Sequence, residues 1–170
     1  FGTIQHIARP DLDPALHGRL YQRLLTADPR RDLDLLAKLN GRIIIPSDVD
    51  WPSQLGDLGV GTPWLLWVRG VPDMRVAMLR SVVIVGARAC TPYGDRVASE
   101  FASELAGLGW CVVSGGAFGI DTAAHRGALA AGGRTAAVLA CGVDVSYPPR
   151  NESLFEQIAE QGFLISEVAP

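Results

Sequence analysis

From Ser81 onward, a short apolar run, a glycine-bearing loop and a stretch of helical periodicity follow one another three times. The apolar runs 82–85, 110–113, 135–139 and 163–166 predict strands, and the β-branched run 82–85 is typical of a strand buried on both faces. Strands that alternate with helices form right-handed βαβ units. The pattern therefore predicts an α/β domain built on a parallel sheet.

Three helices are expected between these strands. The first carries an apolar stripe that ends at Gly109, and the second spans about 119–131, before Gly132-Gly133. The third spans about 151–161. The stripe of the first helix consists of Val97, Phe101, Leu105 and Leu108, and one face of the third carries Leu154, Phe155, Ile158 and Ala159.

The first forty residues carry a different pattern. Apolar residues at helical spacing predict helices before and after the Asp28-Pro29 break: Leu16, Leu20 and Leu24, then Leu33, Leu35, Leu36 and Leu39. Asn40-Gly41 predicts a turn, and residues 42–45 and 64–68 predict strands separated by a polar loop.

These patterns define the expected domain organisation. We expect a short helical segment over 1–40 and an extended Rossmann-like domain over 41–170. A doubly wound parallel sheet usually has five or six strands, so the domain is expected to be truncated after strand four of the repeating pattern.

Composition narrows the class of protein. The 170 residues are 48% hydrophobic and 19% charged, which is typical of globular proteins, and no apolar run reaches the ~20 residues that span a bilayer. The start, Phe1-Gly2-Thr3, lacks the features of a secretory signal, and Cys90, Cys111 and Cys141 form no CxxC pair. We therefore expect a cytoplasmic protein without a membrane segment.

The charge argues against a generally basic, nucleic-acid-binding surface. The net charge is −3, and residues 80–170 hold six Arg and no Lys against nine Asp or Glu. Any site for nucleic acid in this part must therefore concentrate Arg side chains and backbone N–H groups locally.

In such a sheet, ligands bind outside the carboxyl ends of the strands, where three glycine-bearing loops are expected to meet. In the first loop, Gly86 lets the backbone approach a ligand closely, and Arg88 offers a planar guanidinium suited to phosphate. A surface or ion-paired role is the alternative for Arg88. Two roles stay open for Tyr93, which either packs at the start of the helix or stacks on a base.

The loop before the second helix gives the strongest signal of an anion site. Gly115, Gly116 and Gly119 leave N–H groups uncovered at a helix N-terminus, whose partial positive charge favours anions. Ser114 adds a hydroxyl donor. Phe118 either packs beneath the loop or presents its ring to a nucleobase.

Two polar residues of the second helix are interpreted as structural. Asp121 is expected to cap or brace the glycine loop, and His125 to bond a loop carbonyl. His125 has no partner at metal-ligand spacing, and no Ser or Cys lies on a nucleophile elbow, so neither a metal site nor a catalytic residue is expected.

The third loop lies between the third strand and the last helix. Gly142, Asp144 and Tyr147 are assigned to the architecture of this loop, whose Tyr-Pro-Pro turn is rigid. Arg150 is placed within reach of the shared anion site, and Asn151 is interpreted as the N-cap of the last helix.

These loops together resemble the DNA-processing protein A (DprA/Smf) family over roughly residues 40–170. The motifs that carry the resemblance are Gly86-Ala87-Arg88, Thr91-Pro92-Tyr93-Gly94, Ser114 to Asp121, Ala124-His125-Arg126-Gly127-Ala128-Leu129 and Gly142 to Pro148, preceded by Ile45-Pro46, Asp50-Trp51-Pro52 and Leu66 to Gly70. The first two form one pattern, and the resulting four core motifs, in this order and spacing, are highly specific.

The resemblance implies a Rossmann-like binder of single-stranded DNA that is not an enzyme and needs no cofactor. It implies that Gly86, Ala87 and Arg88 hold phosphate and that the loop from Ser114 to Gly119 forms the facing wall. It also implies loading of the RecA recombinase on incoming DNA during natural transformation, and self-association as a homodimer. The family often has Arg at the position of Phe118, which exchanges a phosphate donor for a ring.

The alternative is a nucleotide-processing enzyme on a related fold. Phosphoribohydrolases that activate cytokinins carry a P-G-G-x-G-T-x-x-E motif with an acidic catalyst, whereas Ile120 stands here where the Thr would be and Ala123 where the Glu would be. A third possibility, an NAD-dependent oxidoreductase, would need a glycine at Arg88 and an acid where Ser114-Gly115 stand.

Overall fold

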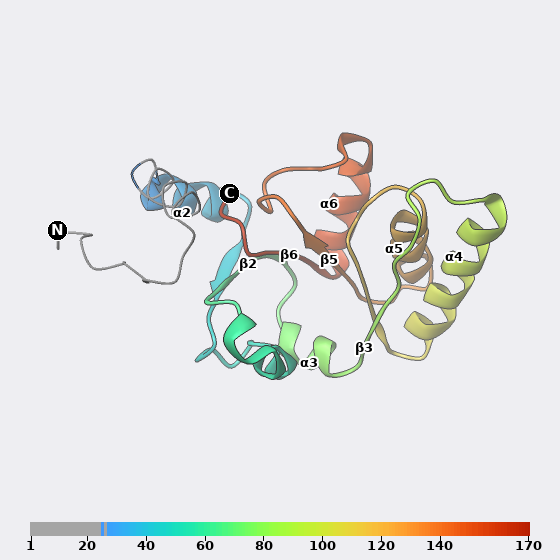
Figure 1. Cartoon of the computed structure of the whole chain (residues 1–170), viewed down its shortest axis with the longest axis horizontal. Helices are drawn as coiled ribbons and strands as arrows, with labels where there is room; N and C mark the ends of the chain where they lie inside the picture. Colours follow the sequence, from blue (N-terminus) through green and yellow to red (C-terminus); the bar gives the residue numbers. More distant parts are fainter. Residues whose placement is uncertain (1–24, 26) are drawn as a thin grey trace. The chain divides into compact units, whose positions relative to one another are not determined.

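The parallel strands predicted from the sequence lie side by side in one sheet. The computed structural model describes residue 25 and residues 27–170, and residues 32–170 form one compact unit. Six strands follow the order β1-β2-β6-β5-β4-β3 (Figure 1). The parallel ones are β3 (Ser81–Val83), β4 (Cys111–Ser114), β5 (Thr135–Leu139) and β6 (Phe163–Ser166). The predicted α/β class is confirmed.

Two further strands make the sheet mixed. β2 (Leu66–Gly70) pairs antiparallel with β6, and β1 (Arg42–Ile44) pairs antiparallel with β2. The sequence predicted both strands but not their place in the same sheet. Two short helices were not expected: the 3-10 helix η2 (Ser53–Gly61) lies where the sequence predicted a polar loop, and α3 (Met74–Leu79) lies in a stretch with no predicted element.

The predicted helices connect the parallel strands. They are α4 (Pro92–Gly107), α5 (Ile120–Ala130) and α6 (Glu152–Gln161), the last preceded by the short 3-10 helix η3 (Pro149–Asn151). α4 begins with Pro92 after Thr91, whose hydroxyl oxygen accepts the N–H of Gly94 at 3.1 Å as an N-cap.

The apolar stripe predicted for α4 is not its buried face. Phe101 and Leu108 are 59% and 65% exposed, whereas the buried residues are Ala98, Ala102 and Ala106. α4 packs closely against α5, where a side chain on Gly127 would collide with the backbone of Ser99. Only small residues fit such a close contact between helices, so size rather than hydropathy decides which face of α4 is inside.

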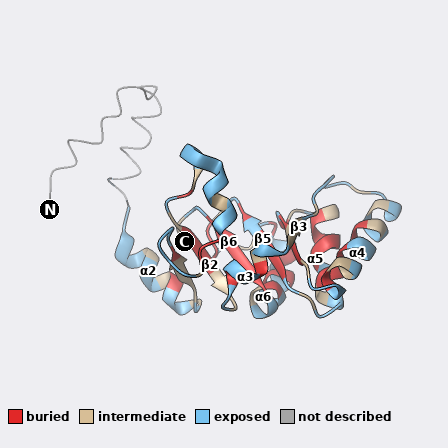
Figure 2. Cartoon of the chain, turned by 90° about the horizontal axis from the view of Figure 1, so that it is seen from below, coloured by how far each residue is buried: buried red, intermediate tan, exposed pale blue. Residues whose placement is uncertain are grey.

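Buried residues gather along the sheet and on the helices packed against it (Figure 2), and two of the three core clusters divide between the faces of the sheet. Alternate residues of β6 divide between them, because Leu164 packs with Phe155 of α6, and Phe163 packs with Met74 of α3. The prediction that residues 82–85 are buried on both faces is wrong. β3 is an edge strand, and Val83 and Val85 are 64% and 62% exposed.

The helix α2 (Pro29–Lys38) confirms the second predicted apolar segment, and Leu36 packs in the same cluster as Trp67 and Phe155. Asn40 adopts a positive φ of 52°, which confirms the turn. The predicted stripe of Leu16, Leu20 and Leu24 lies outside the described residues. The division of the chain at residue 40 stays a prediction.

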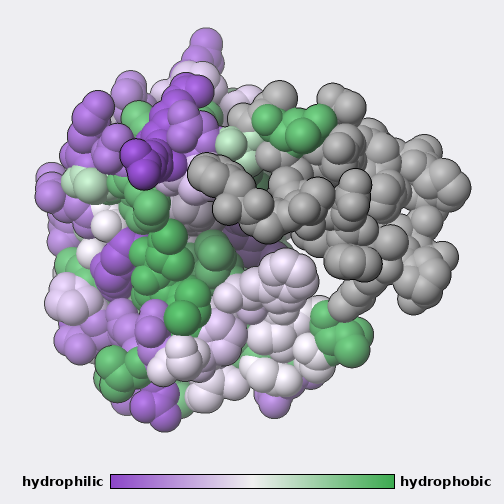
Figure 3. All heavy atoms as spheres, turned by 90° about the vertical axis from the view of Figure 1, so that its left-hand side faces the viewer, coloured by the Kyte–Doolittle hydropathy of each residue, from purple (hydrophilic) through white to green (hydrophobic). Residues whose placement is uncertain are grey.

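The surface mixes hydrophobic and hydrophilic side chains. On the face at the left-hand side of Figure 1, a central group of hydrophobic residues is bordered by hydrophilic ones (Figure 3). Within the part of the chain that the structure describes, no helix is long and apolar enough to cross a membrane.

Candidate ligand-binding cleft

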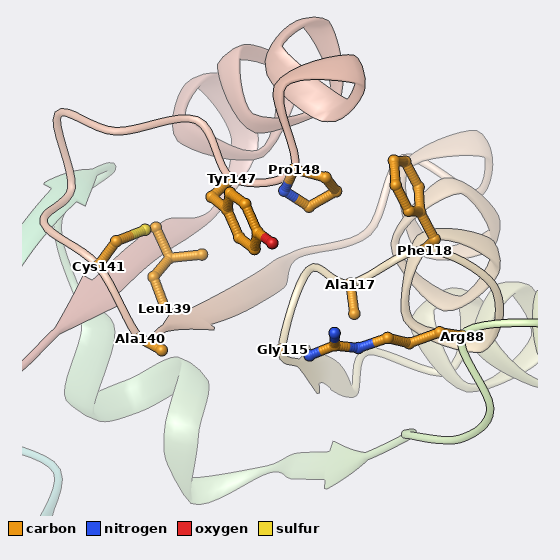
Figure 4. Close-up of a pocket in the computed structure, with 9 residues that line it drawn as sticks. All are labelled: Arg88, Gly115, Ala117, Phe118, Leu139, Ala140, Cys141, Tyr147 and Pro148. Carbon is orange, nitrogen blue, oxygen red and sulfur yellow. The ribbon is translucent and has the colours of Figure 1, made fainter.

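Three loops meet at the carboxyl ends of the parallel strands and enclose a cleft of about 350 Å³ (Figure 4). These are the loops that the sequence predicted to converge. The cleft is lined by Arg88, Gly115, Ala117, Phe118, Leu139, Ala140, Cys141, Tyr147 and Pro148.

The first loop is held against the start of α5. A Cβ atom on Gly86 would lie 2.8 Å from Cγ1 of Ile120, and the carbonyl of Ala87 accepts the N–H of Ile120 at 3.3 Å. Gly86 is therefore required for close packing on α5. Neither Gly86 nor Ala87 lines the cleft.

Arg88 extends from this loop into the cleft, with its guanidinium directed toward Gly115 (Figure 4). It is exposed and forms no ion pair with any described residue, so the ion-paired alternative is not what the structure contains. Tyr93 lies outside the cleft, 69% exposed, with the Arg96 guanidinium 6.0 Å from its ring centroid.

The glycines of the second loop are required by backbone conformation and by packing. Gly116 has φ 77°, and a Cβ atom there would lie 2.6 Å from Cε1 of Phe155. Gly119 has φ 78°, and a Cβ atom would collide with the carbonyl oxygens of Ala87 and Arg88. The loop therefore sits tightly between α6 and the first loop.

Asp121 braces this loop, as predicted. Its carboxylate is buried and accepts the N–H of Gly115 at 3.2 Å and of Ala117 at 3.3 Å. Two of the N–H groups expected to bind an external anion therefore already donate to the carboxylate of Asp121. The N–H groups of Gly116, Phe118 and Gly119 have no acceptor among the described residues.

Ser114 does not present its hydroxyl to the cleft. The side chain is buried and donates to the carbonyl of Ile84 at 2.7 Å. Ile84 follows the end of β3, so this bond ties β4 to the beginning of the first loop. The sequence could not distinguish this role from that of a ligand donor.

Phe118 is 43% exposed and lines the cleft, so its ring does not plug the core beneath the loop. Tyr147 is 65% exposed and lines the same cleft. Its assignment to loop architecture therefore missed its contribution to the cleft surface. Phe118 lies on one side of Pro148 and Tyr147 on the other (Figure 4).

The other predicted residues of the third loop lie outside the lining. Gly142 is buried, and a side chain there would collide with the carboxylate of Asp144, which agrees with structural roles for both. Arg150 is exposed in η3 and does not line the cleft. Cys141 does line it, and burial, with a smaller contribution from Asp144, raises the pKa of its thiol.

Asn151 has a role that the sequence did not reveal. It makes no side-chain cap at α6 and is instead buried, donating from Nδ2 to the Gly116 carbonyl at 3.0 Å and to Thr122 Oγ1 at 2.9 Å. It therefore links the start of α6 to the glycine loop. Its position within a polar loop motif gave no indication of a partner 35 residues away.

His125 is structural, but its partner is a hydroxyl rather than a loop carbonyl. It is fully buried, with Nδ1 2.7 Å from Oγ1 of Thr135, and that hydroxyl donates to the carbonyl of Val112 at 2.6 Å. Nδ1 is therefore the protonated nitrogen. Burial lowers the pKa of His125 to about 4, against a smaller opposing influence of Asp121, so the ring is neutral at pH 7.

The cleft contains few groups for acid–base or metal chemistry. Its lining includes no Asp, Glu or His. Among the described residues, no group of three or more His, Cys, Asp and Glu side chains could hold a metal ion. The available chemistry is one guanidinium, backbone N–H groups, two aromatic rings and an apolar floor.

Comparison with known proteins identifies the family. Residues 42–170 match the sequence profile of the family described as DNA recombination-mediator protein A. The chain belongs to this family. The α/β fold and the convergent loops described above are therefore those of a DprA/Smf domain.

Among the relatives, the putative DNA processing protein DprA of Mycobacterium tuberculosis H37Rv is 42% identical over 149 residues, which cover 82% of this chain and 38% of that protein. The protein Smf of Synechocystis is 38% identical over 142 residues, which cover 82% of this chain and 35% of that protein. The chain thus spans less than half the length of these relatives.

Solved structures of the family have the same fold. DprA from Streptococcus pneumoniae is 32% identical, with a TM-score of 0.71 over 88% of this chain and 51% of that one. DprA from Helicobacter pylori is 28% identical, with a TM-score of 0.65 over 76% of this chain and 56% of that one. The latter structure is described as giving insight into a single-stranded DNA binding mode.

Proposed function

We propose that the cleft at the carboxyl ends of the strands binds single-stranded DNA. The observation that carries this proposal is the pair of exposed rings, Phe118 and Tyr147, which line the same cleft as Arg88, a guanidinium without an ion-pair partner among the described residues (Figure 4). Proteins that bind single strands combine aromatic platforms with positive groups that follow the backbone.

Each part of the cleft has a distinct role in this proposal. Arg88 contacts a phosphate, assisted by the unpaired N–H group of Phe118, and the two rings stack on bases. Gly116 and Gly119 lie outside the cleft lining and act by shaping the loop. Gly86 and Ala87 act by holding Arg88 against α5 rather than by contact with DNA. Because the lining offers few groups that could read base edges, we expect little preference for sequence.

We extend this proposal to the whole protein by family membership. The H. pylori relative, described as a single-stranded DNA binder, supports the ligand. We propose that the complete protein is a cytoplasmic, non-enzymatic mediator of recombination that loads RecA on incoming DNA during natural transformation, and that it works as a homodimer. Tyr93 and Arg150 lie outside the cleft lining, and we assign them contacts with DNA that continues beyond the cleft.

Fluorescence anisotropy of a labelled oligo-dT, titrated at low and moderate salt, tests the cleft. We expect binding that falls steeply with salt and that duplex DNA and AMP compete for poorly. Arg88→Ala should weaken binding and reduce the slope of log affinity against log salt by about 0.7, because one phosphate contact is lost.

Arg126→Ala is the matched control, because Arg126 is an exposed arginine of α5 outside the cleft. It should leave the salt slope unchanged. An unchanged slope in Arg88→Ala would remove Arg88 from the site. Absence of DNA binding together with hydrolysis of AMP would favour the nucleotide-processing enzyme instead.

A further inference from the structure

A second cleft, of about 360 Å³, lies at the opposite, amino ends of the parallel strands. Three of its lining residues immediately precede a strand: Arg80 precedes β3, Trp110 precedes β4 and Arg134 precedes β5. Because parallel strands begin at the same edge of a sheet, these three side chains are brought together from positions 24 or more residues apart in sequence. The motifs of the first cleft include none of them.

The backbone positions of the two arginines are fixed by the sheet. The carbonyl of Arg80 accepts the N–H of Cys111 at 2.8 Å, and the carbonyl of Arg134 accepts the N–H of Val112 at 3.1 Å. Both arginines are thereby anchored on either side of the start of β4. The guanidinium of Arg80 also lies 5.4 Å from the ring centroid of Trp110, a cation–π arrangement that restricts its orientation.

Both guanidinium groups are available to an anion. Arg80 and Arg134 are exposed and form no ion pair with any described residue, and the cleft lining contains no Asp or Glu. The cleft therefore presents two full positive charges in a chain whose net charge is −3. The first cleft presents one.

The helix ends at this edge add negative rather than positive charge to the cleft. α4 and α5 both end beside the cleft, and their C-terminal carbonyls carry about half a negative charge each, which favours nearby cations. The N–H groups of Gly109, Gly132 and Gly133 already donate to helix carbonyls. Attraction of an anion to this cleft therefore comes from the two guanidinium groups alone.

We propose that this amino-end cleft is a second contact for single-stranded DNA. Arg80 and Arg134 bind the phosphate backbone, and Trp110, half-buried beside them, provides the surface on which a base stacks. An aromatic ring between guanidinium groups suits a nucleotide, whereas an acidic peptide would need only the charges. The inference rests on the proposed function of the first cleft and adds a path along which the strand crosses the domain.

This arrangement makes affinity depend on the length of the strand. An oligonucleotide of about 6 nucleotides fills one cleft, since site sizes start near 4 nucleotides for a compact domain. One of about 30 nucleotides reaches both, and the second contact then forms at a high effective concentration. We expect the longer strand to bind more tightly than the extra number of binding positions alone would explain.

The test compares two double variants of the full chain. Arg80→Gln/Arg134→Gln removes the charges of the amino-end cleft, and Lys38→Gln/Arg126→Gln removes the same number of charges from exposed positions outside both clefts. The first variant should lower affinity for the long oligo-dT about tenfold and its salt slope by about 1.4, because two phosphate contacts are lost. It should leave the short oligo-dT unaffected, and the control should change neither.

The outcomes separate the two proposals. If the wild-type chain binds neither oligonucleotide, the function proposed for the first cleft fails and the second contact with it. If Arg88→Ala weakens binding while Arg80→Gln/Arg134→Gln behaves as the wild type, only the second contact is overturned. Equal losses for short and long strands would overturn the two-cleft path. Competition by poly-glutamate as strong as that by unlabelled oligo-dT would assign the cleft to an acidic protein segment instead.

Discussion

The two ends of the parallel sheet each carry a cleft, but they are built from different materials. At the carboxyl end, tight packing holds the loops that carry the lining: Gly86 permits contact with α5, Gly119 permits contact between two loops, and Asp121 holds the glycine loop from behind. At the amino end, the strands simply begin, and the cleft is made by the side chains of Arg80, Trp110 and Arg134.

Because of this difference, substitutions at the two ends affect different properties, folding at one end and ligand binding at the other. At the carboxyl end, substitutions of the loop glycines act first on folding, because these residues are packing contacts. At the amino end, exposed side chains are changed with little effect on the fold, so a loss of binding there reports on the ligand. The two clefts thus call for different kinds of variant.

The largest expected effect is on the free energy of unfolding, when a glycine at each end is replaced by alanine. Gly119→Ala places a Cβ atom against the backbone oxygens of Ala87 and Arg88 at φ 78°, and should lower the free energy of unfolding by about 3 kcal/mol or more. Gly132→Ala, at the amino-end cleft, has φ 68° but open space, and should cost only about 1 kcal/mol. Urea denaturation measures both, and equal losses would mean that the first cleft is not built by packing.

The next effect concerns α5, which runs between the two ends, and tests whether its buried His125 makes the free energy of unfolding depend on pH. His125 has a pKa of about 4 in the folded protein, below its ordinary value of 6.5, so the unfolded chain binds the proton more readily. Stability should therefore fall as the pH falls from about 6.5 to 4, by up to about 3 kcal/mol.

His125→Gln provides the comparison, because glutamine has an N–H donor but no proton that titrates in this range. The difference in the free energy of unfolding between wild type and variant should narrow as the pH falls. Chemical denaturation at pH 7, 5.5 and 4 measures it. A difference that stays constant with pH would show that His125 is not buried as a neutral ring.

The smallest effect concerns binding alone. Phe118→Ala should weaken binding of oligo-dT about tenfold, or about 1.4 kcal/mol, if its ring stacks on a base. Phe101→Ala is matched to it, because Phe101 is likewise exposed, at 59% against 43%, but lies on α4 away from both clefts. Anisotropy at one salt concentration decides, and an equal response of both variants would exclude a specific role for Phe118.

Periodicity predicted the elements best where they are buried on both sides. The strand bounds 135–139 and 163–166 agree with β5 and β6, which lie in the middle of the sheet. Periodicity predicted the wrong buried face for α4. Hydropathy favoured the face that carries Phe101, whereas the close contact with α5 buries the face that carries Ala98 and Ala102. A contact between helices is a property of three dimensions that one helix does not encode.

The position of the candidate site was predicted from local sequence signals, but the partners of some of its residues were not. Glycine loops at strand ends locate the cleft, and an acid at a helix start indicates a brace, so Asp121 was assigned correctly. Ser114 and Asn151 were not, because their partners, Ile84 and Gly116, come from other loops. Short polar side chains serve ligands and backbone equally well, and only the fold determines which.

The link made by Asn151 has a consequence for the rings on either side of it. Phe118 follows the glycine loop that Asn151 holds through Gly116, and Tyr147 belongs to the turn that leads into Asn151. The side-chain amide of Asn151 therefore fixes the spacing between the Phe118 and Tyr147 rings before any ligand binds. A flexible strand that binds between these rings loses conformational entropy, whereas the protein loses little, because its side of the contact is already ordered.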